Sequence, residues 1–319
     1  RFKTIQQAID FLNNAGIKES AAKTVYIAEG TYWEKLEVTV PNVTLIGAGQ
    51  DKTKIEYDAL YGVADEGGFV HTTDSTATLN VRDTAVGFIM KDLTVSNKYN
   101  TLESYNGAAS NDKRALAMLV QADKVVVDNC VLLGFQDTLE LFTGRQLFTN
   151  CLISGSVDFI FGTNNTTYFY KCEIKVVANG SNGGYVTAFK GLNKEHGTDE
   201  VKYGAVFDDC DFTAESGVPD GKSAIGRAWG ADAAVMVMNC RLGKHISKDA
   251  STNAGGRYVS MGNGDPKKAQ FTEYNNSGDG AVTSLTVGKV LSETEAANYN
   301  NLAVIFGTVN CKLTYGDVW

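Results

Sequence analysis

The sequence predicts an all-β solenoid, a parallel β-helix preceded by one short helix, and three observations predict it. One short pattern occurs twice, beginning at Asn129-Cys130 and again at Asn150-Cys151, and its later residues match at the same spacing of 21 residues. Each copy contains short runs of Val, Ile, Leu, Phe and Tyr that Gly, Asn, Asp and Ser interrupt. A helical pattern of apolar residues precedes the repeats. A period of this length with strand-like content is typical of a solenoid.

The N-terminal helix is predicted from its start signal and its apolar stripe. Thr4 and Gln7 have the spacing of a capping box, and Gly16 provides an end signal. The apolar side chains recur at helical spacing, at Ile5, Ala8, Ile9 and Leu12. Such a helix would cover the open end of the first coil, which would otherwise expose core and strand edges.

From residue 24 onward the sequence predicts strands, with loops inserted at a few places. Residues 57–85 and 97–113 lack the period and are expected to leave the solenoid as irregular loops. Insertions at 178–200 and 213–225 lengthen the repeat spacing to 38 and 30 residues. A short helix is expected at 292–299, and a tail ending in Trp319 is expected to pack back on the coils. No linker interrupts the pattern, so residues 1–319 are predicted to form a single domain.

Five of the six cysteines occupy one position of the repeat, and Cys311 is the exception. Stacking at one inward position would make them buried thiols that act as small hydrophobic side chains, in preference to disulfides or metal ligands. The chain has only three histidines, His71, His196 and His245, and it has no C-x-x-C motif. We therefore expect no metal site, no cofactor and no histidine-based catalytic triad.

The charge balance restricts the partners of this chain. Lys and Arg total 29 against 37 Asp and Glu, which gives a net charge of −8. This argues against nucleic acid, and it disfavours a uniformly anionic polymer unless a local cleft differs from the average surface. No apolar run is long enough to span a membrane. The chain begins at Arg1, as it would after removal of a signal peptide.

The repeat also places two carboxylates together. Asp137 and Asp158 lie at the same offset in neighbouring copies, so they should stack on adjacent coils about 4.8 Å apart. Two carboxylates this close cannot both ionise freely, and one should act as a proton donor beside a nucleophile. The amide of Gln136 could stabilise an oxyanion, and Arg227, which precedes Trp229 by two residues, could hold one carboxylate ionised. These groups suit acyl transfer and glycosidic cleavage equally well.

At these residues the chain resembles the pectin methylesterases, carbohydrate esterase family 8. Three segments look like the signature motifs of that family: GFQDTL from Gly134, GSVDFIFG from Gly155 and GRAW from Gly226. The segment 30–47 is similar to the N-terminal strands of the family, and Tyr185-Val-Thr187-Ala and Met261 also find matches. The resemblance covers essentially the whole chain.

The resemblance implies a right-handed parallel β-helix that hydrolyses the methyl esters of polygalacturonate and releases methanol without a metal. Asp158 resembles the nucleophile, and Asp137 resembles the acid that protonates the departing methanol and then the base that activates water. Gln136 resembles the oxyanion donor, and Arg227 the residue that hydrogen-bonds the nucleophile. We expect a secreted monomer whose partner is methyl-esterified homogalacturonan (pectin). The expected substrate-binding residues are Trp229, Phe161, Thr187, Met261 and Val157.

Arg114 departs from the family pattern, and Phe161 departs from the strand parity of the site. Arg114 stands where the family usually has a second glutamine; its guanidinium could stabilise an oxyanion, or pair with a nearby Asp and lower the pKa of the acid. Phe161 has the opposite strand parity to Asp158, so it can reach the same site only through a bend. Two alternatives therefore stay open: a catalytically weakened pectin-binding homologue, and a β-helical pectate lyase or polygalacturonase that cuts the chain.

Overall fold

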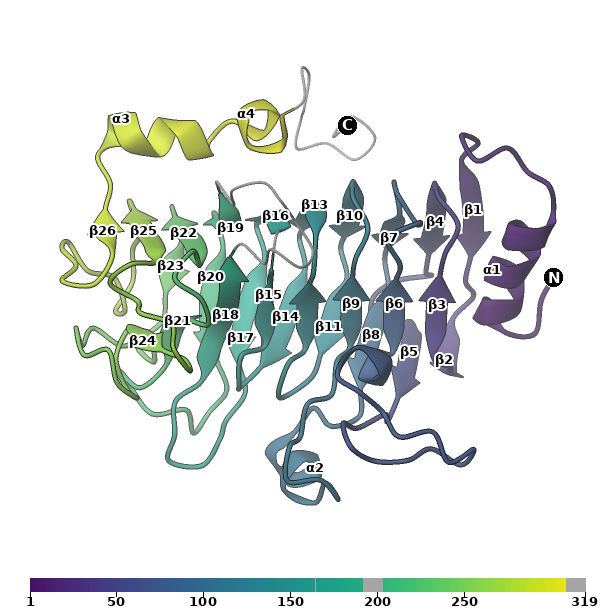
Figure 1. The fold of residues 1–319 in the computed structure, drawn as a ribbon, viewed down its shortest axis with the longest axis horizontal. Coiled ribbons are helices and arrows are strands. Elements are labelled where there is room, and N and C mark those ends of the chain that lie inside the picture. Colours follow the sequence, from purple (N-terminus) through teal and green to yellow (C-terminus); the bar gives the residue numbers. More distant parts are fainter. Residues whose placement is uncertain (164, 192–202, 308–319) are drawn as a thin grey trace.

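The computed structural model describes residues 1–163, 165–191 and 203–307, and their strands form three parallel sheets that run side by side along one axis (Figure 1). Each coil contributes one strand to each sheet in turn. The predicted parallel β-helix is therefore confirmed. Sheet A consists of ten strands: β1 (Lys23–Tyr26), β4 (Val43–Ile46), β7 (Ile89–Lys91), β10 (Val125–Asp128), β13 (Gly144–Thr149), β16 (Asn165–Tyr170), β19 (Gly204–Asp208), β22 (Ala234–Met238), β25 (Gln270–Tyr274) and β26 (Lys289–Val290).

Sheets B and C have eight strands each. Sheet B consists of β2 (Gly30–Trp33), β5 (Thr53–Tyr57), β8 (Thr94–Asn97), β11 (Val131–Leu133), β14 (Leu152–Gly155), β17 (Glu173–Val176), β20 (Asp211–Ala214) and β23 (Arg241–Leu242). Sheet C consists of β3 (Leu36–Val38), β6 (Leu79–Val81), β9 (Met118–Val120), β12 (Leu139–Leu141), β15 (Ile160–Thr163), β18 (Tyr185–Gly191), β21 (Ala224–Ala228) and β24 (Tyr258–Ser260). The 21-residue period is visible in the register, because Val131 pairs with Leu152 and Leu139 with Ile160.

The corner between sheets A and B is built by one left-handed residue per coil. Asn129 and Asn150 have φ values of 53° and 54°, a conformation that Asn and Asp tolerate better than other residues with a side chain. Their side chains also link the coils, since the amide of Asn129 donates to the carboxylate of Asp92 at 2.6 Å. The repeated Asn-Cys pair in the sequence is thus a corner followed by a core residue.

The cysteines after these corners are buried and reduced, as predicted. Burial raises the pKa of the Cys130 and Cys151 thiols well above the usual range, so they act as apolar core groups. Aromatic rings stack beside them along the axis: the ring centroids of Phe148 and Phe169 are 5.0 Å apart, and those of Phe169 and Phe207 are 4.6 Å apart. Cys311 lies outside the described residues.

The predicted N-terminal helix is confirmed as α1 (Ile5–Asn14), which closes the first coil (Figure 1). The Thr4 hydroxyl accepts a hydrogen bond from the N–H of Gln7 at 3.1 Å. The Gln7 side chain accepts from the N–H of Lys3, one residue before the cap. The helix buries Ile5, Ala8 and Ile9 against the coil.

The short helix expected at 292–299 is confirmed, and it begins a C-terminal segment that packs on the outer face of sheet A. It consists of α3 (Glu293–Ala296), capped by Ser292, and the 3-10 turn η2 (Ala297–Tyr299), and α4 (Leu302–Phe306) follows. The segment buries Ala296, Leu302, Ile305 and Phe306 against Val126, Leu147, Tyr168, Val206 and Met236. The expected packing of the tail as far as Trp319 concerns residues outside those that the structure describes.

The expectation of irregular loops at 57–85 and 97–113 was too broad. The first range contains the 3-10 turn η1 (Asp74–Thr76) and strand β6, whose Leu79 and Val81 are core residues. The inserted loop before β6 shifts that strand out of the period, which hides it in the sequence. The second range contains the short helix α2 (Leu102–Asn106), which has a capping box at Thr101. None of the helices in the described part of the chain has the length and apolar character needed to cross a membrane.

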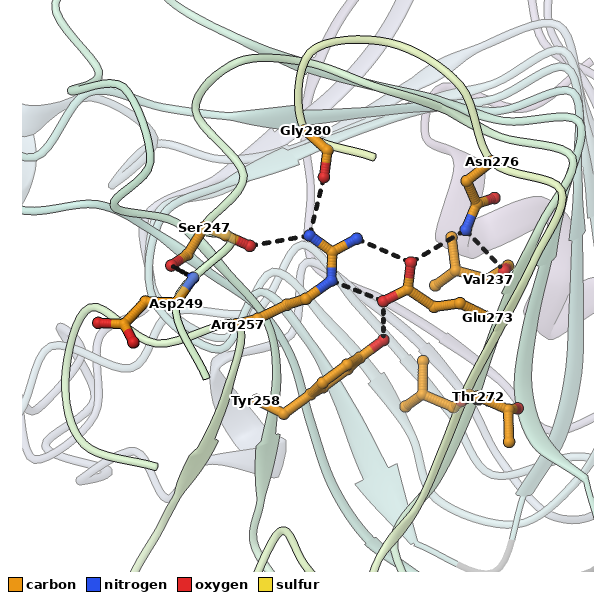
Figure 2. Close-up of polar contacts among 10 residues, drawn as sticks. Val237, Ser247, Asp249, Arg257, Tyr258, Thr272, Glu273, Asn276 and Gly280 are labelled. Carbon is orange, nitrogen blue, oxygen red and sulfur yellow. Dashed lines mark hydrogen bonds and ion pairs between the residues drawn. The ribbon is translucent and has the colours of Figure 1, made fainter. Parts of the chain in front are cut away.

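A buried ion pair lies at the C-terminal end of the coils (Figure 2). The guanidinium of Arg257 donates two hydrogen bonds to the Glu273 carboxylate, at 2.6 and 2.7 Å, and two more to the carbonyls of Ser247 and Gly280. The same carboxylate accepts from the hydroxyl of Tyr258 and from the amide of Asn276. The ion pair therefore links strands β24 and β25 to the loops on either side.

Candidate active site

Asp137 and Asp158 lie at equivalent corners of adjacent coils, as the repeat predicts. Both have left-handed backbones, with φ values of 62° and 50°, and both precede a strand of sheet C. A parallel bridge joins Gln136 to Val157, and the N–H of Asp137 donates to the Val157 carbonyl at 3.0 Å. A Cβ on Gly155 would lie 2.3 Å from the Cβ of Phe159, so this tight corner requires glycine. The corner conformation therefore brings the two carboxyl groups together.

The two carboxyl groups have different environments. Burial raises the pKa of Asp137 well above its usual range, and the charges of Asp158 and Glu140 raise it further, while Arg114 opposes them. Burial also raises the pKa of Asp158, but there the charge and hydrogen bond of Arg227 act in the opposite direction. Of the two carboxyl groups, Asp137 therefore has the stronger tendency to hold a proton. Arg227 was expected to hold Asp158 ionised, and it does favour the carboxylate, although burial outweighs it.

Arg227 fixes one oxygen of Asp158 and leaves the other without a partner. Its Nη1 donates to Asp158 Oδ2 at 2.7 Å, and its guanidinium lies over the ring of Tyr185, 4.4 Å from the centroid. Asp158 Oδ1 is buried and has no hydrogen-bond partner among the described residues. A carboxylate oxygen that makes no other hydrogen bond, beside a second carboxyl group that can donate a proton, could act as a nucleophile.

Gln136 is oriented by a tyrosine that the sequence did not single out as a site residue. Tyr105 lies in α2, one residue before the helix ends. Its hydroxyl donates to Gln136 Oε1 at 3.0 Å, and its ring stacks on the ring of Phe135 with the centroids 4.3 Å apart. The carbonyl of the Gln136 amide is thereby occupied, which leaves its NH₂ group to donate to a ligand. Tyr105 lies 31 residues before Gln136, so no local sequence pattern connects them.

Arg114 forms an ion pair with an aspartate, which is the second of the two expected outcomes. Its guanidinium donates to both carboxylate oxygens of Asp112, at 2.9 and 2.6 Å, and to the Thr73 hydroxyl at 2.6 Å. It also lies over the Tyr61 ring, 3.7 Å from the centroid. The charge of Arg114 lowers the pKa of Asp137, although burial outweighs it. Donation from Arg114 to an oxyanion stays a prediction.

Phe161 faces the same side of sheet C as Arg227, which the strand register shows directly. Phe161 pairs with Ala188, and Ala188 pairs with Arg227. The left-handed corner at Asp158 provides the bend that Phe161 needs. Phe161 and Ala188 belong to one apolar cluster, and Met261 packs against that cluster.

The other predicted substrate-binding residues differ in position. Trp229 is 37% exposed, and Lys190 lies over its ring. Val157 is half-buried at the corner beside Gln136. Thr187 is fully buried and pairs across sheet C with Ile160, a core residue, so its side chain faces the interior of the coil. Its hydroxyl donates a hydrogen bond to the Ile225 carbonyl. This placement does not favour a contact between Thr187 and substrate, and its role stays a prediction.

The carboxylates and histidines of the described residues do not gather into a metal site. Across 1–163, 165–191 and 203–307, no group of three or more His, Cys, Asp or Glu side chains could hold a metal ion.

Comparison with known proteins identifies the family. The pectinesterase family model matches residues 1–307. The chain belongs to the pectinesterase family. It is 32% identical over 315 residues to Pectinesterase 4 of Arabidopsis thaliana, covering 94% of this chain and 47% of that protein. Putative pectinesterase 14 of the same plant is 31% identical and is covered over 84% of its length, with 96% of this chain matched. The chain thus spans about half the length of Pectinesterase 4, and most of Putative pectinesterase 14.

Solved pectin methylesterases share the fold. The enzyme of Yersinia enterocolitica matches with a TM-score of 0.79 and 26% identity, covering 96% of this chain and 99% of its own. A pectin methylesterase in complex with a hexasaccharide matches with a TM-score of 0.79 and 25% identity, over 98% of this chain and 95% of its own. The β-helix of this pectinesterase-family chain is therefore the fold of known pectin methylesterases.

Proposed function

We propose that this chain is a pectin methylesterase that hydrolyses methyl esters of homogalacturonan with Asp158 as nucleophile. The observation that carries the proposal is the asymmetry of the carboxyl pair. Asp158 has one oxygen held by Arg227 and one without a partner among the described residues, and burial raises the pKa of the neighbouring Asp137 well above its usual range. Family membership supports ester hydrolysis over cleavage of the sugar chain.

The reaction proceeds in two steps. Asp158 Oδ1 attacks the ester carbonyl, and the resulting oxyanion accepts a hydrogen bond from the NH₂ of Gln136. As the bond to the methoxy group breaks, Asp137 gives its proton to the methoxy oxygen, methanol departs, and an anhydride between Asp158 and the galacturonate carboxyl remains. Asp137, now ionised, removes a proton from water. The hydroxide attacks the galacturonate carbonyl of the anhydride and expels the Asp158 carboxylate, which leaves Asp137 protonated and Asp158 ionised as at the start. The free galacturonic acid group then loses its proton to solvent.

The substrate and setting follow from the same proposal. A polysaccharide on the outer face of sheet C would contact the exposed ring of Trp229 and the surface around Phe161 and Met261. The solved relative in complex with a hexasaccharide supports an oligosaccharide as ligand. We infer that the protein acts as a monomer outside the cell, on the pectin of cell walls.

The test is methanol release from highly methylated pectin, compared between wild type and Asp158→Ala. Loss of the nucleophile should reduce the rate at least about a thousandfold. The matched control is Asp211→Ala, an exposed aspartate that pairs with Arg241 on sheet B, and this variant should keep full activity. Unchanged turnover in Asp158→Ala would disprove the nucleophile assignment, and a fall in viscosity without methanol would indicate a lyase or polygalacturonase instead.

A further inference from the structure

One column of side chains runs along the outer face of sheet C and includes a carboxyl group that the proposed mechanism does not use. Glu140 pairs with Leu119 on one side and with Phe161 on the other. Its neighbours in the strand, Leu139 and Leu141, belong to the core, so Glu140 faces outward. The complete column across the coils is Glu37, Asn80, Leu119, Glu140, Phe161, Ala188, Arg227 and Val259.

Glu140 is unusual because one of its buried carboxyl oxygens has no hydrogen-bond partner among the described residues. The residue is only 5% exposed, and its Oε2 is buried with no hydrogen-bond partner among the described residues. Its partners across the sheet, Leu119 and Phe161, are apolar. A buried polar atom without a partner costs about 1–3 kcal/mol, so the folded chain gains no stability from it. Such a group is explained if a ligand provides the missing partner.

A second polar atom in the same column is also without a partner. Asn80 lies two strands before Glu140, and its Oδ1 is buried and unpaired among the described residues. Asn80 lines a pocket of about 400 Å³ together with Lys35, Asp74 and Arg82. Unused hydrogen-bonding groups therefore extend along sheet C from this pocket to the Asp137–Asp158 pair.

We propose that Glu140 is a substrate-binding and specificity-determining residue: as an uncharged acid, it donates a hydrogen bond to the carboxylate of a de-esterified galacturonate unit on the outer face of sheet C. The inference rests on the proposed function, because it assigns a second sugar position beside the one that reacts. Only a protonated carboxyl group can make this contact, since two carboxylates would repel each other.

The surroundings of Glu140 favour the protonated, uncharged form of its carboxyl group. Burial, and to a smaller extent the charge of Asp74 in η1, raise the pKa of Glu140 and Arg114 opposes them, with a net value of about 8. Asp137, three residues earlier, is the other acid nearby, and its own pKa is raised. Below pH 8 the uncharged carboxyl donates to a uronate; above it, the ionised form repels the uronate. A methyl ester carries no charge and is a weaker acceptor, so its binding should respond little to this titration.

The experiment measures binding without turnover, in an Asp158→Ala background. Calorimetry with fully de-esterified hexagalacturonate should show affinity about tenfold weaker at pH 9 than at pH 6, which corresponds to about 1.4 kcal/mol. Adding Glu140→Gln should reduce this change to less than about threefold, because the amide donates at both pH values. The fully methyl-esterified hexamer should bind equally at both. Glu173→Gln, an exposed position on sheet B, is the matched control and should keep the tenfold change.

Two results would overturn the inference. One is the same pH dependence with and without Glu140→Gln, in a variant whose thermal transition shows that it is folded. The other is tighter binding of the methyl-esterified hexamer than of hexagalacturonate at pH 6. Failure of the proposed function would look different: wild type would release no methanol, while the pH dependence of binding and its loss in Glu140→Gln would persist.

Discussion

Two arginine–carboxylate pairs lie at the C-terminal half of the coils, and they are built in opposite ways. In the Arg257–Glu273 pair the side chains are 3% and 2% exposed, and both carboxylate oxygens have partners (Figure 2). In the Arg227–Asp158 pair the side chains are 23% and 8% exposed, and a single hydrogen bond joins them. Arg227 Nε and Asp158 Oδ1 are both buried without a partner among the described residues.

The difference separates a structural pair from a reactive one. A buried charge that is fully hydrogen-bonded is held in one geometry and has no group left for a ligand. The Arg227–Asp158 pair keeps unused hydrogen-bonding groups, a cost that the fold does not recover and that substrate binding would offset. Both are arginine–carboxylate ion pairs, and they differ in exposure and in the number of satisfied atoms.

The largest expected effect is on the structural pair. Glu273→Gln should lower the free energy of unfolding by about 3–5 kcal/mol, because it leaves the buried Arg257 without a counter-charge. Urea unfolding measures this. Methanol release per folded molecule should change less than about threefold, since Glu273 is not among the residues of the candidate site. The matched control is Asp211→Asn in the exposed pair with Arg241, which should cost less than about 1 kcal/mol.

The complementary change is Arg227→Met, which keeps an unbranched apolar stem and removes the charged guanidinium. We expect methanol release to fall about a hundredfold, because burial then raises the pKa of Asp158 unopposed and fewer molecules hold an ionised nucleophile. Stability should change by less than about 1 kcal/mol, since the pair has one bond and is partly exposed. A stability loss as large as that of Glu273→Gln would contradict the distinction between the two pairs.

A third prediction concerns the unused carboxyl of Glu140. Its folded-state pKa of about 8 lies above the usual value of a glutamate. The folded state therefore binds a proton more tightly than the unfolded chain does, and the stability present at pH 4 is lost as pH rises to 8. Glu140→Gln should make that loss of stability smaller by about 2 kcal/mol. Urea unfolding at several pH values measures the difference. An identical pH profile in the variant would contradict the burial of an uncharged acid at this position.

The smallest effect is expected at Arg114. Arg114→Gln removes a cation that lowers the pKa of Asp137, so the pKa of this proton donor should rise further. The alkaline limb of the pH profile of kcat/KM should then move to higher pH, with a change of less than about tenfold at the optimum. Lys113→Gln, a neighbouring lysine that lies over the Tyr105 ring, provides a comparison. A loss of a hundredfold or more in Arg114→Gln would instead indicate that Arg114 contacts the oxyanion directly.

Much of this fold could be predicted because a solenoid converts sequence spacing into spatial position. The 21-residue offset of Asp137 and Asp158 places them on adjacent coils, as the bridge between Gln136 and Val157 shows. The column of buried cysteines and the helix α1 follow from equally local patterns. Strand β6 was missed because the loop before it breaks the period, and spacing then carries no information.

The partners of the site residues could not be predicted in the same way. Tyr105 reaches Gln136 from α2, and Arg114 turns to Asp112, Thr73 and Tyr61. These contacts depend on how the inserted loops fold over the coils, and no period governs that. Glu140 passed unnoticed for a related reason: a glutamate between two leucines resembles an exposed strand residue.

The sequence by itself determined the coil register, the inward cysteines and the pairing of the two aspartates, because each depends on a repeat distance that backbone hydrogen bonds enforce. Tertiary structure alone decided which polar atoms are satisfied. It pairs both oxygens of Glu273, leaves Asp158 Oδ1 and Glu140 Oε2 unpaired among the described residues, and sets the direction of each pKa shift. The physical reason is that burial and hydrogen-bond geometry depend on every neighbour in space, whatever its distance along the chain.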